Sequence, residues 1–331
     1  MQKFKAFRVS EAEEKVFSAE LIQLELDDLP EGDVLIDVHY SSLNYKDALS
    51  ASGSKAVTRQ YPHVPGIDAA GVVIASSDTG FAEGDEVIVT GYDLGMNTSG
   101  GFGQTIRVPA AWLVKRPDGL SMRESMVLGT AGFTAALCVE KLITNGVTPD
   151  SGKVLVTGAT GGVGIVAVAL LHKLGYQVTA STGKVSAHDL LQQVGASEII
   201  DRAELSAENP RPMLKQRWAA AVDVVGGDTL FNVVKSLSYG GSVACCGLVQ
   251  STQFSASVLP FILRGVNLLG VDSVELPIES KTSVWHKLAQ DWKLSNLDSL
   301  CTEIGFDELE ENLKRILKGE ATGRYLLNLR S

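Results

Sequence analysis

Short apolar segments separated by turn signals fill the first third of the chain. Their β-branched and partly alternating side chains are typical of half-buried strands, and Gly-Asp turns precede two of them. These segments are residues 34–40, 71–75, 86–90, 102–108 and 112–115. One helix is expected to interrupt them, beginning at Tyr45 with Asn44 as its cap. The pattern predicts a small, barrel-like β domain.

From about residue 121 the pattern changes to helices that alternate with strands. A helical pattern covers residues 121–142, although Gly129 and Gly132 loosen it. Buried strands are expected at residues 154–156, 177–181, 198–201, 220–225, 242–246 and 266–271. About six such strands with helices between them predict a doubly wound parallel sheet. Beyond residue 272 we expect mainly helix, with a last strand at residues 324–329.

A glycine-rich turn joins the strand at residues 154–156 to an apolar helix that continues to Leu174. Its glycines depart from the usual G-x-G-x-x-G spacing, since Gly158, Gly161 and Gly164 are three apart. Glycine lets the backbone approach a pyrophosphate, which the helix N-terminus attracts. A merely structural turn is the alternative. The nucleotide-binding candidates are Thr160, Gly161, Gly162, Val163 and Gly164.

The end of the second strand of this unit indicates which dinucleotide binds. An NAD site commonly places Asp or Glu there to bind the ribose hydroxyls. This chain has instead Ser181, Thr182, Gly183 and Lys184. Hydroxyls and a cation suit a 2′-phosphate, so we expect NADPH; a solvated polar turn is the alternative interpretation.

Composition and charge exclude several classes of protein. The 331 residues allow two domains, and 45% hydrophobic with 21% charged residues is ordinary for a soluble globular protein. A formal net charge of −10 argues against a general nucleic-acid binder. No signal peptide and no apolar run near the length of a membrane span is recognised, and the four cysteines lack C-x-x-C spacing. We therefore expect a cytoplasmic protein without a cysteine zinc site.

Several segments together resemble one family, the zinc-independent medium-chain dehydrogenases/reductases of the quinone oxidoreductase type. The similarity is closest to the bacterial NADPH-dependent acrylyl-CoA reductase group and spans residues 30 to about 325. The segments that carry it are residues 41–47 (SSLNYKD), 64–68 (VPGID), 129–135 (GTAGFTA), the glycine-rich turn, 170–176 (LLHKLGY), 259–264 (LPFILR) and 269–273 (LGVDS).

The resemblance implies a GroES-like β-rich substrate domain from residues 1–122 and 273–331, and a Rossmann NADPH-binding domain from residues 123–272. It also implies that the cofactor lies in the cleft. Zinc-containing relatives have a Cys and a Gly-His-Glu where this chain has Leu43-Asn44-Tyr45 and Gly66-Ile67-Asp68, so we expect no metal. A short-chain dehydrogenase is the rival fold, but its Tyr-x-x-x-Lys motif is absent from the chain.

Asn44 and Tyr45 are the catalytic candidates. Hydride transfer to the β-carbon of an activated alkene, or to a quinone, places negative charge on an oxygen that nearby donors stabilise. The alternative makes Asn44 a helix cap and Tyr45 a packing aromatic that touches the cofactor ribose. Asp68 is expected to be a structural turn carboxylate rather than a residue that orients a donor. Further cofactor-binding candidates, partly from the resemblance, are Tyr45, Gly247, Leu248, Leu269, Val271, Asp272 and Arg324; an exposed terminal charge is the equal alternative for Arg324.

The substrate is left open between an α,β-unsaturated acyl-CoA, such as acryloyl-CoA, and a quinone or another enone. A non-catalytic NADPH-binding protein is a further alternative, since the superfamily also serves as structural lens protein. Candidate cations for the coenzyme A phosphates are Lys46, Lys55, Arg59 and Arg264, although such residues are usually solvated surface. The resemblance suggests a homodimer, for which residues 266–271 supply a sheet edge.

Overall fold

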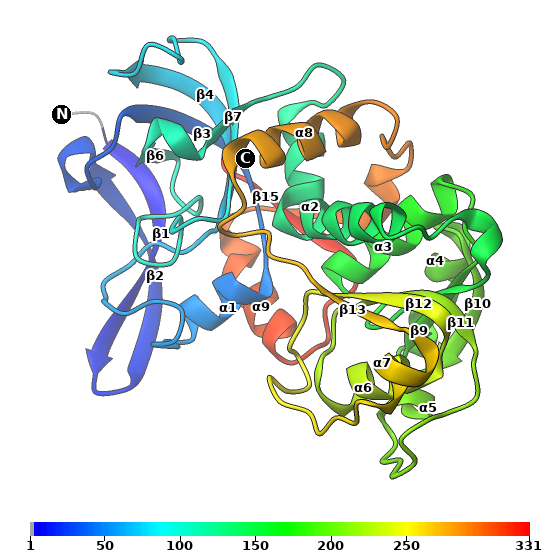
Figure 1. Cartoon of the computed structure of the whole chain (residues 1–331). Helices are drawn as coiled ribbons and strands as arrows, with labels where there is room; N and C mark the ends of the chain where they lie inside the picture. Colours follow the sequence, from blue (N-terminus) through cyan, green and yellow to red (C-terminus); the bar gives the residue numbers. More distant parts are fainter. Residues whose placement is uncertain (1–2) are drawn as a thin grey trace. The chain divides into compact units, whose positions relative to one another are not determined.

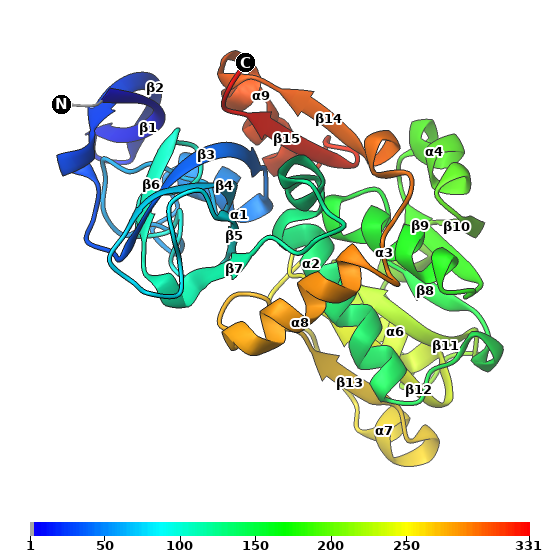
Figure 2. The ribbon, with the colours of Figure 1, turned by 90° about the horizontal axis from the view of Figure 1, so that it is seen from above.

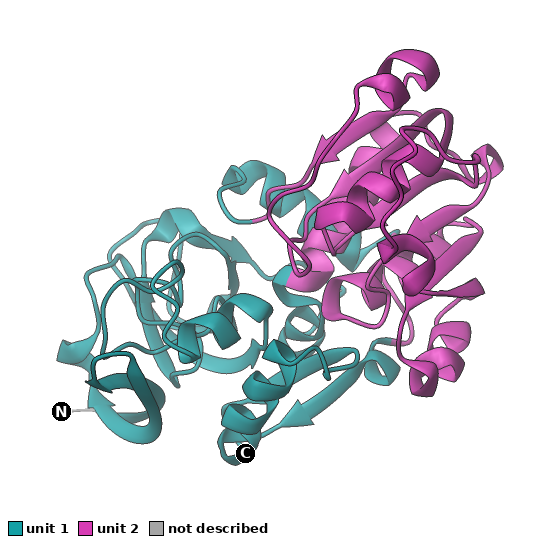
Figure 3. Cartoon of the chain, turned by 90° about the horizontal axis from the view of Figure 1, so that it is seen from below, with its two compact units in different colours: residues 1–130, 274–291, 297–331 teal, residues 131–273, 292–296 magenta. Residues whose placement is uncertain are grey.

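The computed structural model describes residues 3–331, which form two compact units (Figure 3). The first unit ends at Thr130 and adds Val274–Asp291 and Leu297–Ser331; the second is Ala131–Ser273 with Trp292–Asn296. The boundary between Ser273 and Val274 lies one residue from the expected 272/273 boundary. The first lies inside helix α2 (Met122–Thr144) rather than at residue 122, because α2 is broken at Gly129, whose φ of 51° and ψ of −159° are not helical.

The second unit contains the doubly wound sheet that the sequence predicts. Its six strands are β8 (Val154–Val156), β9 (Val178–Thr182), β10 (Ala196–Asp201), β11 (Trp218–Asp223), β12 (Leu237–Cys245) and β13 (Asn267–Gly270). All pair in parallel, in the order β10-β9-β8-β11-β12-β13 (Figure 1). The strand order reverses beside β8, so the turn that follows β8 lies at the topological switch point, where such sheets bind ligands.

Helices connect these strands and bury their apolar faces. They are α3 (Gly162–Lys173), α4 (His188–Gln193), α5 (Ala203–Ser206), α6 (Gly227–Ser236) and α7 (Leu259–Arg264). The middle of α3 is buried without interruption from Gly164 to Leu171, as expected for a helix of the interior. Helix α6 buries Leu230, Val233 and Val234 in a core that includes Trp218.

The first unit is built mainly from antiparallel strands. Strands β1 (Lys3–Glu13) and β2 (Val16–Glu25) form a hairpin. The larger sheet contains β3 (Val34–Ser42), β4 (Asp68–Ser76), β5 (Glu86–Thr90), β6 (Thr105–Val108), β7 (Leu113–Lys115), β14 (Cys301–Ile304) and β15 (Arg324–Asn328). Strand β15 pairs with β3, so the expected C-terminal strand completes this sheet. Strand β14 was missed, because its four residues include the polar pair Thr302 and Glu303.

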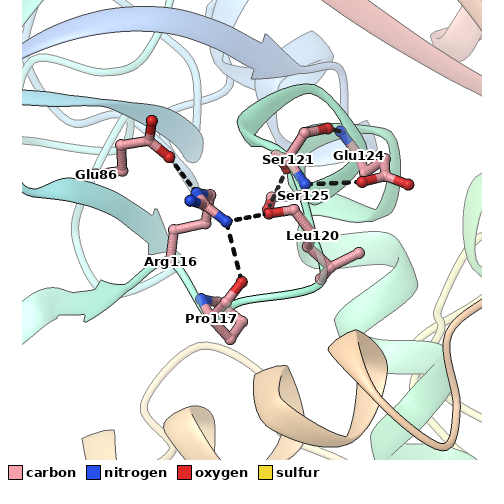
Figure 4. Close-up of polar contacts among 7 residues, drawn as sticks. All are labelled: Glu86, Arg116, Pro117, Leu120, Ser121, Glu124 and Ser125. Carbon is pink, nitrogen blue, oxygen red and sulfur yellow. Dashed lines mark hydrogen bonds and ion pairs between the residues drawn. The ribbon is translucent and has the colours of Figure 1, made fainter.

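Helices α1 (Tyr45–Ala51), α8 (Ile278–Ala289) and α9 (Phe306–Leu317) complete the first unit (Figure 2). The chain enters α2 through a well-defined cap, drawn in Figure 4. The Ser121 N–H donates to Glu124 Oε2 at 2.7 Å, and the Glu124 N–H donates back to Ser121 Oγ at 3.1 Å, which is a capping box. Arg116 holds the preceding turn, with Nε to Glu86 and Nη1 to the carbonyls of Pro117 and Leu120.

Helix α2 corrects one expectation. Within the described part of the chain it is long and apolar enough, by length and composition, to cross a membrane. Its most apolar window is nevertheless 78% buried inside the protein, which is usual for a core helix. The apolar surface of α2 is therefore accounted for by the protein interior.

Candidate active site

The turn after β8 presents backbone donors at the start of a helix. Gly161 caps α3, and the first N–H that bonds within the helix is that of Ile165, to the Gly161 carbonyl at 2.9 Å. The N–H groups of Gly162, Val163 and Gly164 therefore lack helical acceptors. A side chain on Gly164 would meet the carbonyl oxygen of Gly158 at 2.3 Å, so turn and helix pack too closely for any other residue. This arrangement fits a dinucleotide pyrophosphate.

A buried carboxylate, which the sequence analysis missed, braces this turn. Asp223 at the end of β11 accepts hydrogen bonds from Thr157 Oγ1 and from the Gly226 N–H, both at 2.7 Å. Burial raises the pKa of Asp223, and these hydrogen bonds partly oppose that shift. Asp223 thus fixes the carboxyl ends of two neighbouring strands; a charged residue inside the apolar strand predicted at residues 220–225 was the only available signal.

The end of β9 and the residues that follow it are held against the glycine-rich turn. Ser181 and Thr182 are only 2% and 4% exposed. Thr182 Oγ1 lies 3.3 Å from Thr160 Oγ1 and accepts the Lys184 N–H at 3.1 Å. The Thr182 hydroxyl, predicted to bind a 2′-phosphate, is therefore used to fix the loop, the Ser181 side chain is buried, and Gly183 is the exposed member of the predicted set.

The remaining candidates of this unit gather at the ends of β12 and β13. A side chain on Gly247 would meet the Val224 carbonyl oxygen at 2.0 Å, so this residue lies directly against the end of β11. The Val271 N–H donates to the Cys245 carbonyl at 3.0 Å. The sheet thus brings Gly247 and Leu248 to the same edge as Leu269, Val271 and Asp272, beside the glycine-rich turn.

The first unit contains a closed polar cluster, which we call the Asp68 cluster and define as Ser42, Asn44, Asp47, Asp68, Thr130 and Arg324. Asp68 is 0% exposed. Its Oδ2 accepts Ser42 Oγ at 2.5 Å, Asn44 Nδ2 at 2.7 Å and the Thr130 N–H at 2.8 Å. Its Oδ1 accepts Thr130 Oγ1 at 2.5 Å. Asp68, expected to be a turn carboxylate, therefore orients the Asn44 amide.

This geometry changes the interpretation of Asn44. Its backbone N–H donates to Asp47 Oδ2 at 2.8 Å, at the start of α1 as predicted. Its amide Nδ2 donates a hydrogen bond to Asp68 Oδ2 and also lies 3.4 Å from the Ser42 carbonyl oxygen. Asn44 is therefore a positioning residue, because its amide donors have partners inside the protein and are not available to a developing oxyanion.

Asp47 is the second carboxyl group of the Asp68 cluster. Its Oδ1 accepts the Ile67 N–H at 2.8 Å. Complete burial, together with the nearby charge of Asp68, raises the pKa of Asp47 to about 7. The cluster can therefore change its charge near neutral pH.

Tyr45, by contrast, is an accessible donor. It is the first residue of α1 and is 37% exposed. Within the described chain its hydroxyl has no hydrogen-bond partner. Tyr45 therefore remains the catalytic candidate, whereas the adjacent Asn44 fixes the helix that carries it.

Arg324 lies in the Asp68 cluster and is 3% exposed, so the alternative of an exposed terminal charge is wrong. Its Nε donates to the Val127 carbonyl at 2.9 Å and its Nη1 to the Leu43 carbonyl at 3.2 Å. A side chain on Gly129 would meet both Asp68 Oδ2, at 2.6 Å, and Arg324 Nη2, at 2.9 Å. Arg324 thus supplies the countercharge of Asp68, and this burial removes the support for a phosphate contact.

Four basic residues were candidates to bind the phosphates of coenzyme A, and two of them already bond other groups of the protein. Lys55 Nζ bonds Glu11 at 2.7 Å, and the Arg264 guanidinium donates to the carbonyls of Lys235, Leu237 and Leu214. The side chains of Lys46 and Arg59 make no hydrogen bond or ion pair within residues 3–331.

Comparison with known proteins identifies the family. Residues 30–118 match the alcohol dehydrogenase GroES-like domain, and residues 162–290 match the zinc-binding dehydrogenase family. "Putative quinone oxidoreductase YhfP" of Bacillus subtilis (strain 168) is 48% identical over 304 residues, which are 92% of each chain. The chain belongs to the medium-chain dehydrogenase/reductase family. This confirms the resemblance and the two-part fold inferred from the sequence.

Other members of the medium-chain dehydrogenase/reductase family are similar over nearly the whole chain. Acrylyl-CoA reductase AcuI of Ruegeria pomeroyi is 45% identical over 307 residues, 93% of each chain. The yhdH oxidoreductase of Salmonella enterica, crystallised with NADP, superposes with a TM-score of 0.95 at 45% identity, covering 98% of this chain and 99% of that one. Bacillus subtilis yhfP, crystallised with NAD, gives 0.96 at 45% identity, covering 99% and 100%.

The description of one matching family as zinc-binding raises the question of whether the Asp68 cluster fits zinc. Zinc is held by thiolate, imidazole or free carboxylate ligands. Here Asn44 Nδ2 and two Thr130 donors occupy the Asp68 oxygens, and the Arg324 guanidinium is adjacent. This donor set does not fit a zinc ion.

Proposed function

We propose that this medium-chain dehydrogenase/reductase uses NADPH to reduce the C=C bond of an α,β-unsaturated acyl-CoA, acryloyl-CoA to propionyl-CoA, without a metal. The observation that carries the proposal is the 45% identity with acrylyl-CoA reductase AcuI over 93% of both chains. The segment after β9 supports the cofactor, because it has no carboxylate to bind the 2′-hydroxyl or to repel a 2′-phosphate.

Bound NADPH supplies the hydride, which is added to the β-carbon of the substrate. The N–H groups of Gly162, Val163 and Gly164 would hold the pyrophosphate, with Thr160 fixing the turn. The residues at the ends of β12 and β13 would border the nicotinamide. Tyr45 donates a hydrogen bond to the thioester oxygen as charge develops there, or a proton to the α-carbon through water. Asn44 and Asp68 act through the position of α1.

A quinone reductase is the second candidate, because YhfP, named as a quinone oxidoreductase, is 48% identical over 92% of both chains. Steady-state assays with NADPH and either acryloyl-CoA or 1,4-benzoquinone separate the two. We expect kcat/KM for acryloyl-CoA to exceed that for the quinone by at least ~100-fold, from the binding of the coenzyme A tail. Comparable or faster turnover of the quinone would overturn the thioester assignment.

Exposed apolar side chains support a homodimer. They lie on β13, the edge strand of the parallel sheet, and on α7 and the residue before it; they are Val258, Ile262, Leu263 and Leu268. An unpaired edge strand next to an apolar patch is a ready interface for a second copy. The four described cysteines are free, which suits the proposed cytoplasmic location.

A further inference from the structure

Side chains on one face of helix α2 bond the last two strands of the parallel sheet. Asn145 Nδ2 donates to Ser242 Oγ of β12 at 2.6 Å. Lys141 Nζ donates to the Gly270 carbonyl of β13, also at 2.6 Å. Cys138 is three positions before Lys141 and seven before Asn145, so it lies on the same face of the helix. Helix α2 therefore holds the buried thiol of Cys138 against this part of the sheet.

The residue of the sheet that meets Cys138 is Cys246, which directly follows β12. Side chains an even number of positions apart along a strand share a face, so Cys246 lies on the same side as Ser242, which bonds α2. Cys245 lies on the opposite side and packs against the core that contains Trp218. A hydrogen bond between the Cys138 and Cys246 thiols, together with burial, raises the pKa of Cys138. The fold therefore brings these two thiols together.

The two thiols differ in how easily a small molecule reaches them. Cys138 is fully buried, whereas Cys246 is half-buried at the carboxyl edge of the sheet, where its Sγ lies 3.5 Å from the Asp223 carbonyl oxygen. The raised pKa keeps Cys138 protonated, so its S–H can donate to the sulfur of Cys246. A small oxidant therefore reaches Cys246 first, with Cys138 beside it as the second thiol.

We propose that Cys138 and Cys246 form a redox modification site, at which hydrogen peroxide converts the two thiols into a reversible disulfide. The sulfur of Cys246 attacks one peroxide oxygen and becomes a sulfenic acid, and water is released. The sulfur of Cys138 then attacks the sulfur of Cys246 and forms the S–S bond, while the sulfenic oxygen leaves as a second water. The thiols together lose two electrons and two protons, and the peroxide is reduced to two waters.

The disulfide changes the edge of the sheet that is proposed to border the cofactor. A covalent S–S bond is shorter than any contact between two thiols, so its formation draws Cys246 toward α2. The next residue, Gly247, packs directly against the end of β11, since a side chain on it would meet the Val224 carbonyl oxygen at 2.0 Å. Movement of Cys246 therefore displaces Gly247 and Leu248. We expect weaker binding of NADPH, a consequence that rests on the proposed function, whereas the disulfide itself does not.

The first test maps the disulfide in the full-length protein. The protein is treated with hydrogen peroxide, alkylated with iodoacetamide and digested without reductant for mass spectrometry. We expect a pair of peptides linked through Cys138 and Cys246, with the other two of the four free cysteines still alkylated, and dithiothreitol should remove the link. Cys245→Ser removes the neighbouring thiol on the opposite face and should form the same link. A link between Cys245 and Cys246, or oxidation without any link, would overturn the proposal.

Variants of the pair test which thiol reacts first. Cys138→Ser should stop the reaction at the sulfenic acid of Cys246, which dimedone traps, and Cys138→Ala repeats the test without a hydroxyl in the core. Cys246→Ser should leave the buried Cys138 reduced, because the more accessible thiol is gone. A dimedone adduct on Cys138 in the wild type, with none on Cys246, would contradict the proposed order.

The second test measures the effect on the cofactor by calorimetric titration with NADPH. Oxidised wild type should bind NADPH at least about 10-fold more weakly than reduced wild type and recover with dithiothreitol, whereas peroxide should not change the affinity of Cys246→Ser. Unchanged affinity in a protein that carries the mapped link would overturn the effect on the cofactor edge. If reduced wild type does not bind NADPH, the proposed function fails, while the mapped disulfide still decides this inference.

Discussion

The two polar regions of this protein differ in what is left unpaired. In the Asp68 cluster of the first unit, the oxygens of Asp68 have protein donors, and Arg324 supplies the countercharge. At the carboxyl edge of the parallel sheet in the second unit, the first N–H groups of α3 lack helical acceptors. There the guanidinium of Arg202, the residue after β10, faces solvent.

This difference separates residues that hold the backbone in place from residues that can bind a ligand. The Asp68 cluster, in which both Asp68 oxygens have protein donors, holds backbone segments in place, and within the described residues Arg324 Nη2 is buried there without a hydrogen-bond partner. Donors that remain unpaired at a sheet edge are the ones that an anionic cofactor can use. Catalytic candidates that are chosen by residue type alone include both positioning residues and ligand-binding residues. Asn44, chosen as a donor, is a positioning residue. The difference predicts that substitutions in the first region change stability, whereas those in the second change affinity.

The largest effect is expected from Asp68→Ala. The change leaves Ser42, Asn44 and the Thr130 N–H without their acceptor and Arg324 without its countercharge, all in the interior. Breaking a buried charged network in this way costs about 3–5 kcal/mol. Urea denaturation, followed by tryptophan fluorescence, should show this loss in the free energy of unfolding of the first unit.

Arg202→Gln is the matched control in the open region, since it also removes a charge but at an exposed side chain. It should change the free energy of unfolding by no more than about 0.5 kcal/mol. Stability losses of similar size in the two variants would contradict the distinction between closed and open regions.

Two glycines of one turn sharpen the comparison. Gly162→Val adds methyl groups at the half-exposed start of α3, where the phosphates approach, and should weaken NADPH binding at least ~100-fold while the thermal midpoint stays within a few degrees. Gly164→Ala instead meets the Gly158 carbonyl at 2.3 Å, so it should lower the thermal midpoint as well. Calorimetric titration and thermal scans of both variants measure this. Unchanged NADPH affinity in Gly162→Val would mean that the phosphate turn is wrongly assigned.

The features that could be predicted from the sequence are those encoded locally. The six parallel strands carry β-branched apolar runs, and the turn after β8 carries its glycines within seven residues, so both were identified correctly. The helix start after Asn44 follows from a single residue with a strong preference, whereas Gly129 and Gly132 were expected only to loosen the helix that the structure breaks at Gly129. Strand β14, with polar residues at half of its positions, carries no such signal.

The features that sequence analysis missed depend on contacts between distant residues. Asp68 meets Thr130 across 62 positions, Asp223 meets Thr157 across 66, and Arg324 meets Leu43 across 281. Without these contacts, Arg324 resembled a free cation and Asn44 a free donor. Register between strands decides which side chains are used inside the protein, and an individual sequence segment does not encode it.

The smallest effect, a dependence of stability on pH, tests whether the closed region carries its charge as described. Burial raises the pKa of Asp47 to about 7, above its ordinary value of 3.8. The native state therefore binds this proton more tightly than the unfolded state. The stabilisation that this gives is complete below the unfolded pKa and is lost as pH rises through about 7. From pH 5 to 7 we expect a loss of about 2 kcal/mol, within the limiting slope of about 1.4 kcal/mol per pH unit for one proton.

Asp47→Asn isolates this contribution. The amide cannot accept from both the Asn44 and the Ile67 N–H groups, so the variant is less stable at every pH, but its stability should vary less between pH 5 and 7. Asp85→Asn is the control, because Lys115 lowers the pKa of the partly exposed Asp85, whose contribution is lost only in more acidic solution. It should keep the wild-type slope over this range. Parallel pH profiles for wild type and Asp47→Asn would mean that Asp47 is already ionised at pH 5, and the Asp68 cluster would then hold two buried negative charges against the single guanidinium of Arg324.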